Sequence, residues 1–254
     1  KPLLILAFAY MIERFPPRNF RNIVLNFIIF IIPTFMIFRQ PDLGTALVVT
    51  AIWITQIFVA GIPWGYIGST FVAFLLSLPL LPRFLHDYQL KRLTTFIDPF
   101  SDPLGNGYNV IQSIIAVGSG GILGKGLGHG TQSHLRFLPE RHTDFAFASL
   151  AEELGLVGTL FVIGIMGSFI YRLLTTMTHS ETKGSRYILS GVLAYFAFQA
   201  LVNIGMNIGL APVTGVTLPL ISYGGSSILA TGIILGLASS VIVSSKTIRS
   251  LEIR

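Results

Sequence analysis

The side chains best suited to chemistry lie in one short segment, Phe137 to Phe145. This segment places Glu140, Arg141, His142 and Asp144 within five positions, directly before a long apolar run. A carboxylate at the start of a helix that faces a semi-enclosed cavity is a candidate general base, because it can take the proton from a hydroxyl oxygen as that oxygen attacks. Asp144 is the predicted base.

Helix capping is the alternative interpretation of the same residues. Thr143 or Asp144 can accept from the first N–H groups of a helix that begins near Phe145, and Glu140 suits the positive end of its dipole. Capping explains part of the pattern, but not so many ionisable side chains at the mouth of an apolar helix. The helix dipole and nearby cations would lower the pKa of Asp144, whereas burial would raise it, and the sequence leaves both directions open.

A second candidate is the glycine-rich segment Gly118–Gly130, which contains Lys125. It is not a nucleotide-binding P-loop, because Lys125 is followed by Gly126 rather than by Ser or Thr, and no strand precedes it. Two interpretations stay open. The segment is either a loop whose backbone N–H groups and Lys125 approach a phosphate, or a flexible re-entrant turn.

Glu152 and Glu153 lie inside the apolar run that follows Asp144. Charged side chains within a membrane span are costly, and they usually face a protein interior or a cavity. We expect these two to line a cavity or to pair with a Lys or Arg. The alternative is a buried pair that only holds two helices together.

The histidines do not predict zinc, because they lack a compact ligand pattern such as His-Glu-x-x-His. The carboxylates between residues 83 and 144 could instead hold a hard divalent cation, Mg²⁺ or Mn²⁺, that bridges phosphates. The metal identity stays open, and no organic cofactor is expected.

Two further polar motifs interrupt apolar runs on the same side of the predicted spans as the Asp144 segment. One contains Asp42, within Gln40–Thr45, and the other contains Asn203 and Ser222. We predict that all three side chains line an outer cavity. The alternatives are that Asp42 only caps the next helix and that small residues near Ser222 only permit close helix packing.

The scaffold that positions these residues is a membrane protein. Of 254 residues, 52% are hydrophobic and 11% are charged, whereas globular chains carry roughly 25% charged residues. Because about 20 apolar residues cross a bilayer, spans are predicted at Asn22–Phe38, Gly44–Ala60, Gly65–Leu81, Phe145–Leu173, Tyr187–Gly209 and Gly224–Ser244, after a shorter apolar piece at Pro2–Ile12. The predicted fold class is an all-α, polytopic transmembrane helix bundle that forms one integral-membrane domain over residues 1–254.

The distribution of charge predicts the orientation. The formal charge is +6, and the basic residues cluster in segments that the spans place on one side: Arg14, Arg18, Arg21, Arg172, Lys183, Arg186, Lys246, Arg249 and Arg254. The positive-inside rule makes that side cytoplasmic, so the charge does not indicate nucleic-acid binding. The long loop at residues 83–144 is then extracytoplasmic, and its weaker apolar stretch, Val110–Leu123, is predicted to be re-entrant or interfacial.

Several motifs resemble the SEDS family (shape, elongation, division and sporulation). They occur in the family's order along nearly the whole chain: Gln40–Thr45, Asp102–Asn109, Gly130–Ser133, Phe137–Phe145, Ala151–Gly155 and Leu218–Ser226. Arg141 after Glu140, and Ala151 before the two glutamates, are more similar to the RodA elongation branch than to the FtsW division branch.

The resemblance implies a peptidoglycan glycosyltransferase of the bacterial inner membrane that polymerises lipid II on the extracytoplasmic face. The acceptor GlcNAc 4-hydroxyl would attack C1 of the donor MurNAc with inversion, and undecaprenyl diphosphate would leave. The family's proposed catalytic acid residue maps onto Asp144. The implied partner is a class B penicillin-binding protein, a transpeptidase that crosslinks the strands.

Substrate binding is predicted for Lys125, Arg136, Arg141, Glu140, His142, Gln132 and Lys1. The charge and loop position of Lys125, Arg136 and Arg141 suit stabilisation of the diphosphate. Lys1 resembles the lysine that ends the family's Ser-Glu-x-x-Lys motif. The chain is therefore expected to be a fragment of a roughly ten-span fold that lacks the first three spans.

Two other functions are weighed against the transferase. A flippase or transporter of lipid-linked precursor would use the many spans and the charges of Glu152 and Glu153. Transport predicts a polar path to both faces, but the polar residues here gather at the outer face. A scaffold for the transpeptidase would bind its partner without making polymer.

Overall fold

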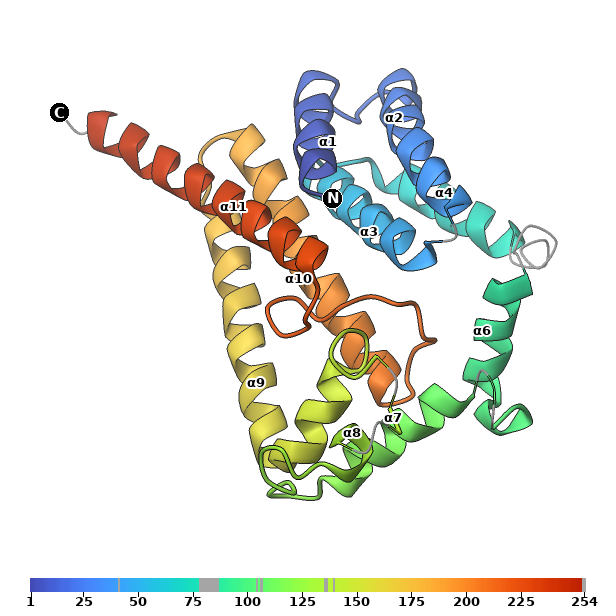
Figure 1. The fold of residues 1–254 in the computed structure, drawn as a ribbon. Coiled ribbons are helices and arrows are strands. Elements are labelled where there is room, and N and C mark those ends of the chain that lie inside the picture. The colour runs from blue at the N-terminus through green and yellow to red at the C-terminus, as the bar shows by residue number, and fades with distance from the viewer. Residues whose placement is uncertain are drawn as a thin grey trace. The chain divides into compact units, whose positions relative to one another are not determined.

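The computed structural model describes residues 1–40, 42–77, 87–103, 105, 107–134, 137–138 and 140–252. Every regular element within these ranges is a helix. In chain order they are α1 (Pro2–Arg14), α2 (Phe20–Arg39), α3 (Leu43–Val59), α4 (Trp64–Ser77), α6 (Asp87–Ile97), the 3₁₀ turn η2 (Pro99–Ser101), α7 (Tyr108–Ser119), α8 (Thr131–His134), α9 (Ala146–Thr178), α10 (Lys183–Asn207) and α11 (Gly225–Glu252) (Figure 1). The predicted all-α fold class is confirmed.

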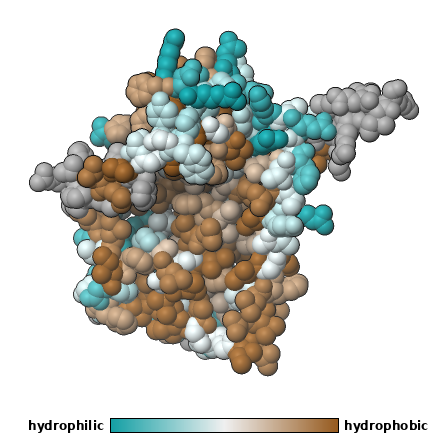
Figure 2. Space-filling view, turned by 180° about the vertical axis from the view of Figure 1, so that it is seen from behind, coloured by the Kyte–Doolittle hydropathy of each residue, from teal (hydrophilic) through white to brown (hydrophobic). Residues whose placement is uncertain are grey.

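Among the described residues, four helices are long and apolar enough to cross a membrane: α2, α9, α10 and residues 225–244 of α11. Helix α3 is a shorter apolar helix. Apolar side chains also cover much of the face shown in Figure 2. Most predicted spans agree with these helices to within a few residues, although α9 extends beyond Leu173 to Thr178. Helix α4 covers the first part of the predicted span Gly65–Leu81, and the end of that span lies outside the described residues.

The chain divides into two compact units. The first contains residues 1–84, 170–198 and 229–254, and the second contains residues 85–169 and 199–228. The single integral-membrane domain over residues 1–254 stays a prediction.

The first unit is held together by polar and aromatic contacts between its helices. Gln56 on α3 is fully buried, and its side-chain amide donates to the carbonyls of Ile5 on α1 and Tyr187 on α10, both at 3.0 Å. Phe30 on α2 stacks on Trp53 of α3 with ring centroids 4.3 Å apart. Buried amides that bond across helices are typical of membrane bundles, where the alternative is an unpaired polar group in hydrocarbon.

The second unit is built around the first turns of α9. On one side, Phe145 and Ala148 pack with Ala116 of α7 and with Leu138. On another side, Phe147 packs with a second cluster that contains Ala200 of α10 and Leu218. The start of α9 is therefore fixed by tertiary packing on two sides, and this is the point where the predicted base lies.

Two features of the loop at residues 83–144 differ from the sequence-based description. Helix α6 was not predicted, because its eleven residues are too few and too polar to resemble a span. The stretch Val110–Leu123 forms α7 up to Ser119 and continues into the glycine-rich loop. Its re-entrant or interfacial placement stays a prediction.

Candidate active site

The segment before α9 forms a compact turn around Glu140. The backbone carbonyl of Glu140 accepts from the N–H groups of Thr143, at 3.1 Å, and Phe145, at 3.2 Å. The Thr143 hydroxyl donates to the Glu140 carboxylate at 2.9 Å. Glu140 adopts a positive φ of 54°, a left-handed conformation that costs an L-residue roughly 1–2 kcal/mol. These hydrogen bonds hold the turn in that conformation.

Backbone carbonyls of the same turn are bonded to the segments at residues 203–207 and 222–223. The carbonyl of residue 142 accepts from the Tyr223 N–H at 2.7 Å, and that of residue 143 accepts from the Ser222 hydroxyl at 2.6 Å. The carbonyl of residue 144 accepts from the side-chain amides of Asn203, at 2.9 Å, and Asn207, at 3.1 Å. Four residues from a distant part of the sequence thus fix the backbone that carries Asp144.

Asn203 and Ser222 therefore act on the backbone in this structure. Asn203 is fully buried, and its amide also donates to the carbonyl of Val216 at 2.7 Å. Ser222 is nearly as buried, and its hydroxyl also accepts from the Leu218 N–H at 2.8 Å. Their predicted place in a cavity wall stays a prediction. The i, i+4 spacing of Asn203 and Asn207 on one helix face was the available signal for the positioning role.

Asp144 itself is only partly buried, and its side chain is not used for capping. Among the described residues, none donates a hydrogen bond to its carboxylate, so the alternative that Asp144 caps α9 is not seen. Burial raises the pKa of Asp144 above its ordinary value, the nearby charge of Glu140 raises this pKa further, and Arg92 opposes both. Of the two directions that the sequence left open, burial therefore dominates.

Arg92 is the site residue that the sequence analysis missed. It lies on α6, a helix whose buried face is polar: Gln89 and Thr95 are buried there, while Leu93 and Ile97 on other positions are exposed. Gln89, Arg92 and Thr95 recur at a spacing of three residues, which places them on one helix face. That polar periodicity was the available signal for an inward-facing Arg92.

A cavity of about 210 Å³ adjoins this arginine. Its wall is formed by three residues of α6, by the start of α7, and by the segment after α10: Arg92, Thr95, Phe96, Gly105, Asn109, Val110, Ala211, Pro212 and Val213. Gly215, two residues beyond this wall, lies against Asp144, because a β-carbon built on it would be 3.6 Å from the Asp144 Oδ2 atom. Arg92 and the segment at residues 211–215 therefore connect the cavity with the carboxylate.

A break in α9 receives the glycine-rich loop. Gly155 has φ 65° and ψ −167°, which are not helical values. The carbonyls of residues 152 and 153 accept instead from the N–H groups of Lys125, at 3.1 Å, and Gly126, at 3.0 Å. The N–H groups of residues 156 and 157 donate to the carbonyls of residues 121 and 122, at 2.9 and 3.1 Å. The loop thus replaces the helical partners that the break removes.

These hydrogen bonds to α9 show what the backbone of the glycine-rich segment does. It packs against the helix rather than forming a phosphate-binding loop. The N–H groups of Lys125 and Gly126 bond to α9 in this structure and are not directed to a phosphate. The glycines allow close backbone approach: a β-carbon on Gly124 would lie 2.1 Å from the carbonyl oxygen of Glu153, and one on Gly120 would lie 2.1 Å from that of Ala151. Their role at these positions is close packing.

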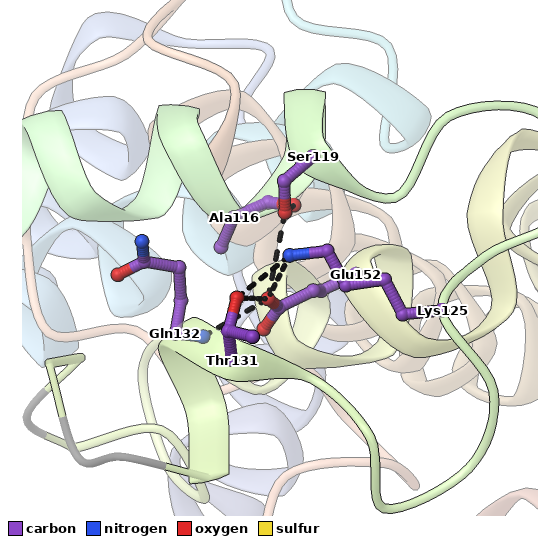
Figure 3. A network of polar contacts seen from close by, with 6 residues as sticks. All are labelled: Ala116, Ser119, Lys125, Thr131, Gln132 and Glu152. Carbon is purple, nitrogen blue, oxygen red and sulfur yellow. Dashed lines mark hydrogen bonds and ion pairs between the residues drawn. The ribbon is translucent and has the colours of Figure 1, made fainter.

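Glu152 is the centre of a polar cluster in the same region (Figure 3). Its side chain is fully buried, and its Oε1 atom accepts from Lys125 Nζ at 2.9 Å. The same oxygen accepts from the Thr131 hydroxyl at 3.1 Å, the Gln132 N–H at 2.9 Å and the Ser119 hydroxyl at 3.4 Å. Glu152 thus has the cationic partner that was expected, and the pair connects α9 with the loop and the start of α8.

The predicted binding residues fall into several groups. Glu140, Arg141 and His142 lie in the Asp144 turn, where Arg141 Nε donates to His142 Nε2 at 3.1 Å. Lys125 and Gln132 belong to the Glu152 cluster. The ion pair with Glu152 offsets the charge of Lys125.

The remaining predicted residues do not join these groups. Arg136 lies outside the described residues. Lys1 and Asp42 belong to the first unit, where they are close enough to interact electrostatically. Asp42 caps α3 by accepting from the Thr45 N–H at 2.9 Å, as its alternative interpretation predicted. Glu153 is half-buried, and its predicted cavity role stays a prediction.

The described residues do not assemble a metal site. No group of three or more His, Asp or Glu side chains that could hold an ion occurs within the described ranges. The divalent cation therefore stays a prediction, and we derive no chemical step through one.

Comparison with known proteins assigns this fold and site to a family. The sequence profile of FtsW, RodA and SpoVE proteins, described as "Cell cycle protein", matches residues 1–247. The chain belongs to the FtsW/RodA/SpoVE family. The SEDS resemblance of its motifs is thereby confirmed.

Relatives in this family are similar over nearly the whole chain. The peptidoglycan glycosyltransferase MrdB of Escherichia coli K12 is 43% identical over 242 residues, which are 93% of this chain and 65% of the relative. The probable peptidoglycan glycosyltransferase FtsW of Aliivibrio salmonicida is 37% identical over 92% of this chain and 60% of its own length. The chain thus spans slightly less than two thirds of the length of these relatives.

Solved structures of FtsW/RodA/SpoVE relatives share the fold. Thermus thermophilus RodA superposes with a TM-score of 0.66 at 31% identity, over 96% of this chain and 64% of the other. A chain from a structure described as "Structural coordination of polymerization and crosslinking by a peptidoglycan synthase complex" superposes with a TM-score of 0.77 at 38% identity, over 95% of this chain and 68% of the other. The predicted polytopic membrane fold is that of the family.

Proposed function

We propose that this chain forms the catalytic part of a peptidoglycan glycosyltransferase that polymerises lipid II during cell elongation. The observation that carries the proposal is the state of the Asp144 carboxylate. A fixed backbone turn holds this residue, and no described residue donates a hydrogen bond to its carboxylate. The carboxylate also interacts electrostatically with Arg92, which lines a cavity. The names of the relatives support the reaction class. The similarity to a solved structure described as a "Rod shape determining protein RodA" supports the elongation branch.

In the proposed reaction, Asp144 acts as the general base. It accepts the proton of the acceptor GlcNAc 4-hydroxyl while that oxygen forms a bond to C1 of the donor MurNAc. The bond from C1 to the diphosphate oxygen breaks, the electron pair leaves with undecaprenyl diphosphate, and the α-linkage becomes β. The raised pKa suits this role, because a base with a pKa nearer to the working pH accepts a proton more effectively.

Cations near the turn would stabilise the negative charge that develops on the leaving diphosphate. Arg141 and Arg92 are the candidates among the described residues of the second unit. Lys125 is a weaker candidate than its sequence position suggested, because its ammonium group bonds to Glu152 and Thr131. Arg136 and Lys1 stay predictions.

The reaction is placed at the extracytoplasmic face of the bacterial inner membrane. The basic loops between the predicted spans support this orientation, because positive residues are retained on the cytoplasmic side. The loop at residues 83–144, which leads into the Asp144 turn, is on the opposite side by the same argument.

The proposed partner is a class B penicillin-binding protein that crosslinks the new strands. Support comes from the similarity to a chain in a complex described as coordinating polymerization and crosslinking. Nucleic acid is not a proposed partner, since membrane topology accounts for the basic residues.

The proposal is tested with lipid II and the purified protein at its full natural length. Asp144→Asn keeps the size of the side chain but removes its basicity, so we expect polymer yield to fall by at least about 100-fold, the lower range of general-base effects. Asp98→Asn is the matched control, because Asp98 is an exposed carboxylate that caps η2 in the same loop. Near-normal polymer from a well-folded Asp144→Asn protein would exclude Asp144 as the base.

A further inference from the structure

The tip of the glycine-rich loop is apolar and exposed. Ile122 is 68% exposed, Leu123 is 82% exposed, and Leu127, three residues beyond Gly124, is 73% exposed. Large apolar side chains that point outward together on a loop are unfavourable in water, and they mark contact with a partner or a membrane. The question is what covers them.

The loop tip is continuous with an exposed apolar face of α9. The hydrogen bonds from residues 156 and 157 to the carbonyls of residues 121 and 122 place the tip directly beside this helix. Leu156 and Val157 are more than half exposed, as are Leu160 and Phe161 one turn further on. The tip and this face form one apolar surface within the second unit.

The position of the break along α9 gives the depth of this surface. No charged residue occurs from residue 154 to residue 171, between Glu153 and Arg172. These 18 residues would extend for about 27 Å as a helix, close to the ~30 Å thickness of bilayer hydrocarbon. Gly155 and the loop bonded to it therefore lie at one end of the stretch that crosses the hydrocarbon, on the side of the candidate site.

The polar groups around the loop are compatible with that depth. Irregular backbone tolerates contact with lipid only where its N–H and C=O groups have protein partners. Here the carbonyls of residues 121 and 122 and the N–H groups of residues 125 and 126 are bonded to α9. The ammonium of Lys125 is paired with Glu152. The exposed side chains of Ile122 and Leu123 thus lie between backbone groups that are bonded to α9.

We propose that the loop tip, Ile122 and Leu123, is seated among the acyl chains of the outer leaflet beside α9. The loop then anchors the outer segment of the protein in the membrane. The anchor holds the Glu152 cluster and the start of α8 at the level of the lipid head groups. This inference does not depend on the reaction that the site catalyses.

Single introduced cysteines give a direct test, because these 254 residues contain none. A spin label on Leu123→Cys is measured in vesicles of phosphatidylethanolamine and phosphatidylglycerol. Collision with oxygen, which concentrates in hydrocarbon, is compared with collision with a water-soluble nickel chelate. Leu160→Cys, on the exposed face of α9, is the reference for lipid, and Ser101→Cys, exposed in η2, is the reference for water.

We expect the ratio of oxygen to nickel accessibility at residue 123 to approach that at residue 160 and to exceed that at residue 101 several-fold. A ratio like that at residue 101 would place the tip in water and overturn the proposal. Shielding from both reagents would show that protein, such as a second copy of the chain, covers the tip, which also overturns it. None of these outcomes depends on glycosyltransferase activity, so the two proposals fail separately.

Discussion

Two charged residues act on the Asp144 carboxylate in opposite directions. Glu140 favours the protonated form through like-charge repulsion, and Arg92 favours the ionised form through attraction. Burial of Asp144 has a larger effect on its pKa than either of these charges. If Asp144 is the general base, the acidic limb of the pH–rate profile reports these effects, because only the ionised form accepts a proton.

Two substitutions should therefore move this limb in opposite directions. Arg92→Gln removes the cation, so the pKa of Asp144 rises and activity is lost at a higher pH than in the natural protein. Glu140→Gln removes the repulsion but keeps an oxygen for the Thr143 hydroxyl, so activity persists to a lower pH. The measurement is kcat/KM for lipid II against pH, in which the acidic limb should move to higher pH with Arg92→Gln and to lower pH with Glu140→Gln.

Asp98→Asn is the control for this pair and should leave the limb in place. If the acidic limb of the pH–rate profile moved in the same direction in both variants, the electrostatic account of the site would be contradicted. An unchanged limb in both would indicate that another group controls the acidic side of the profile.

The ion pair between Lys125 and Glu152 should stabilise the contact between the glycine-rich loop and α9. Lys125→Met removes the ammonium group that bonds to the fully buried Glu152, which should destabilise the protein by on the order of 3 kcal/mol. Adding Glu152→Gln to that variant removes the buried carboxylate charge and should restore much of the loss. Glu153→Gln, at the half-buried neighbouring position, should change stability by less than about 0.5 kcal/mol.

Thermal unfolding in one detergent compares the four proteins. Equal stability of Lys125→Met and the natural protein would show that the ion pair does not hold the loop on α9. A double variant less stable than Lys125→Met would show that Glu152 acts mainly through its other hydrogen bonds.

At the scale of elements, the break in α9 and the loop that fills it form one structural unit. Gly155 is indispensable to it, because its φ of 65° with ψ of −167° is a conformation that only glycine adopts readily. A β-carbon at this position would also lie 2.2 Å from the backbone nitrogen of Gly124. The loop could not remain bonded to the helix.

Gly155→Ala should therefore unfold at a clearly lower temperature, with a loss of more than about 2 kcal/mol from strain and clash together. Gly164→Ala is the matched control in the same helix, because nothing lies within 4 Å of its β-carbon. That variant should be neutral or gain up to about 1 kcal/mol from helix propensity. Similar midpoints for both alanine variants would mean that the break is not a specific feature of the fold.

The sequence predicted the elements that have a strong periodic or apolar signal. The long spans were found because a continuous apolar run of that length, such as the one in α2, predicts a membrane-crossing helix. Helix α6 was missed because its buried face is polar and its apolar side chains Leu93 and Ile97 point outward, the reverse of the usual pattern. The break at Gly155 was missed because α9 also contains Gly158, Gly164 and Gly167, and spacing alone does not single out Gly155.

The site was predicted in part for similar reasons. Asp144 could be singled out because charged residues cluster before an apolar run. The polar face of α6 was a signal that Arg92 points inward, but its effect on Asp144 depends on tertiary structure that this spacing does not specify. Asn203 and Ser222 were recognised as polar interruptions of spans, but their bonds to the backbone of the turn depend on a fold that spacing alone does not specify.

Across the molecule, several polar side chains are fully buried while many large apolar side chains are exposed. Gln56, Asn203, Asn207 and Glu152 are fully buried, whereas much of the surface shown in Figure 2 is apolar. This distribution is the one expected where lipid, rather than water, surrounds the helices. It supports the polytopic assignment independently of the count of spans.

The orientation in the membrane gives a prediction at the same scale. Ser101→Cys, in the loop at residues 83–144, should react with a membrane-impermeant maleimide added outside spheroplasts of a bacterium that has an outer membrane. Glu181→Cys, between α9 and α10, should react only after the cells are permeabilised, since Arg172, Lys183 and Arg186 flank its loop and the positive-inside rule predicts a cytoplasmic position for it. These 254 residues contain no cysteine, and the protein without an introduced cysteine is the background control. If Glu181→Cys reacted in intact spheroplasts and Ser101→Cys reacted only after permeabilisation, the topology would be the reverse of the predicted one. The site would then not lie on the outer face.

The central claim is that Asp144 acts in the chemical step rather than in binding, and it is tested by measuring both on one variant. With Asp144→Asn, we predict that lipid II binds within about threefold of its natural affinity while the single-turnover rate of glycan bond formation falls by roughly 100- to 10,000-fold, the range of general-base catalysis. A loss of affinity that accounts for the whole loss of rate would contradict the claim, as would a single-turnover rate close to that of the natural protein.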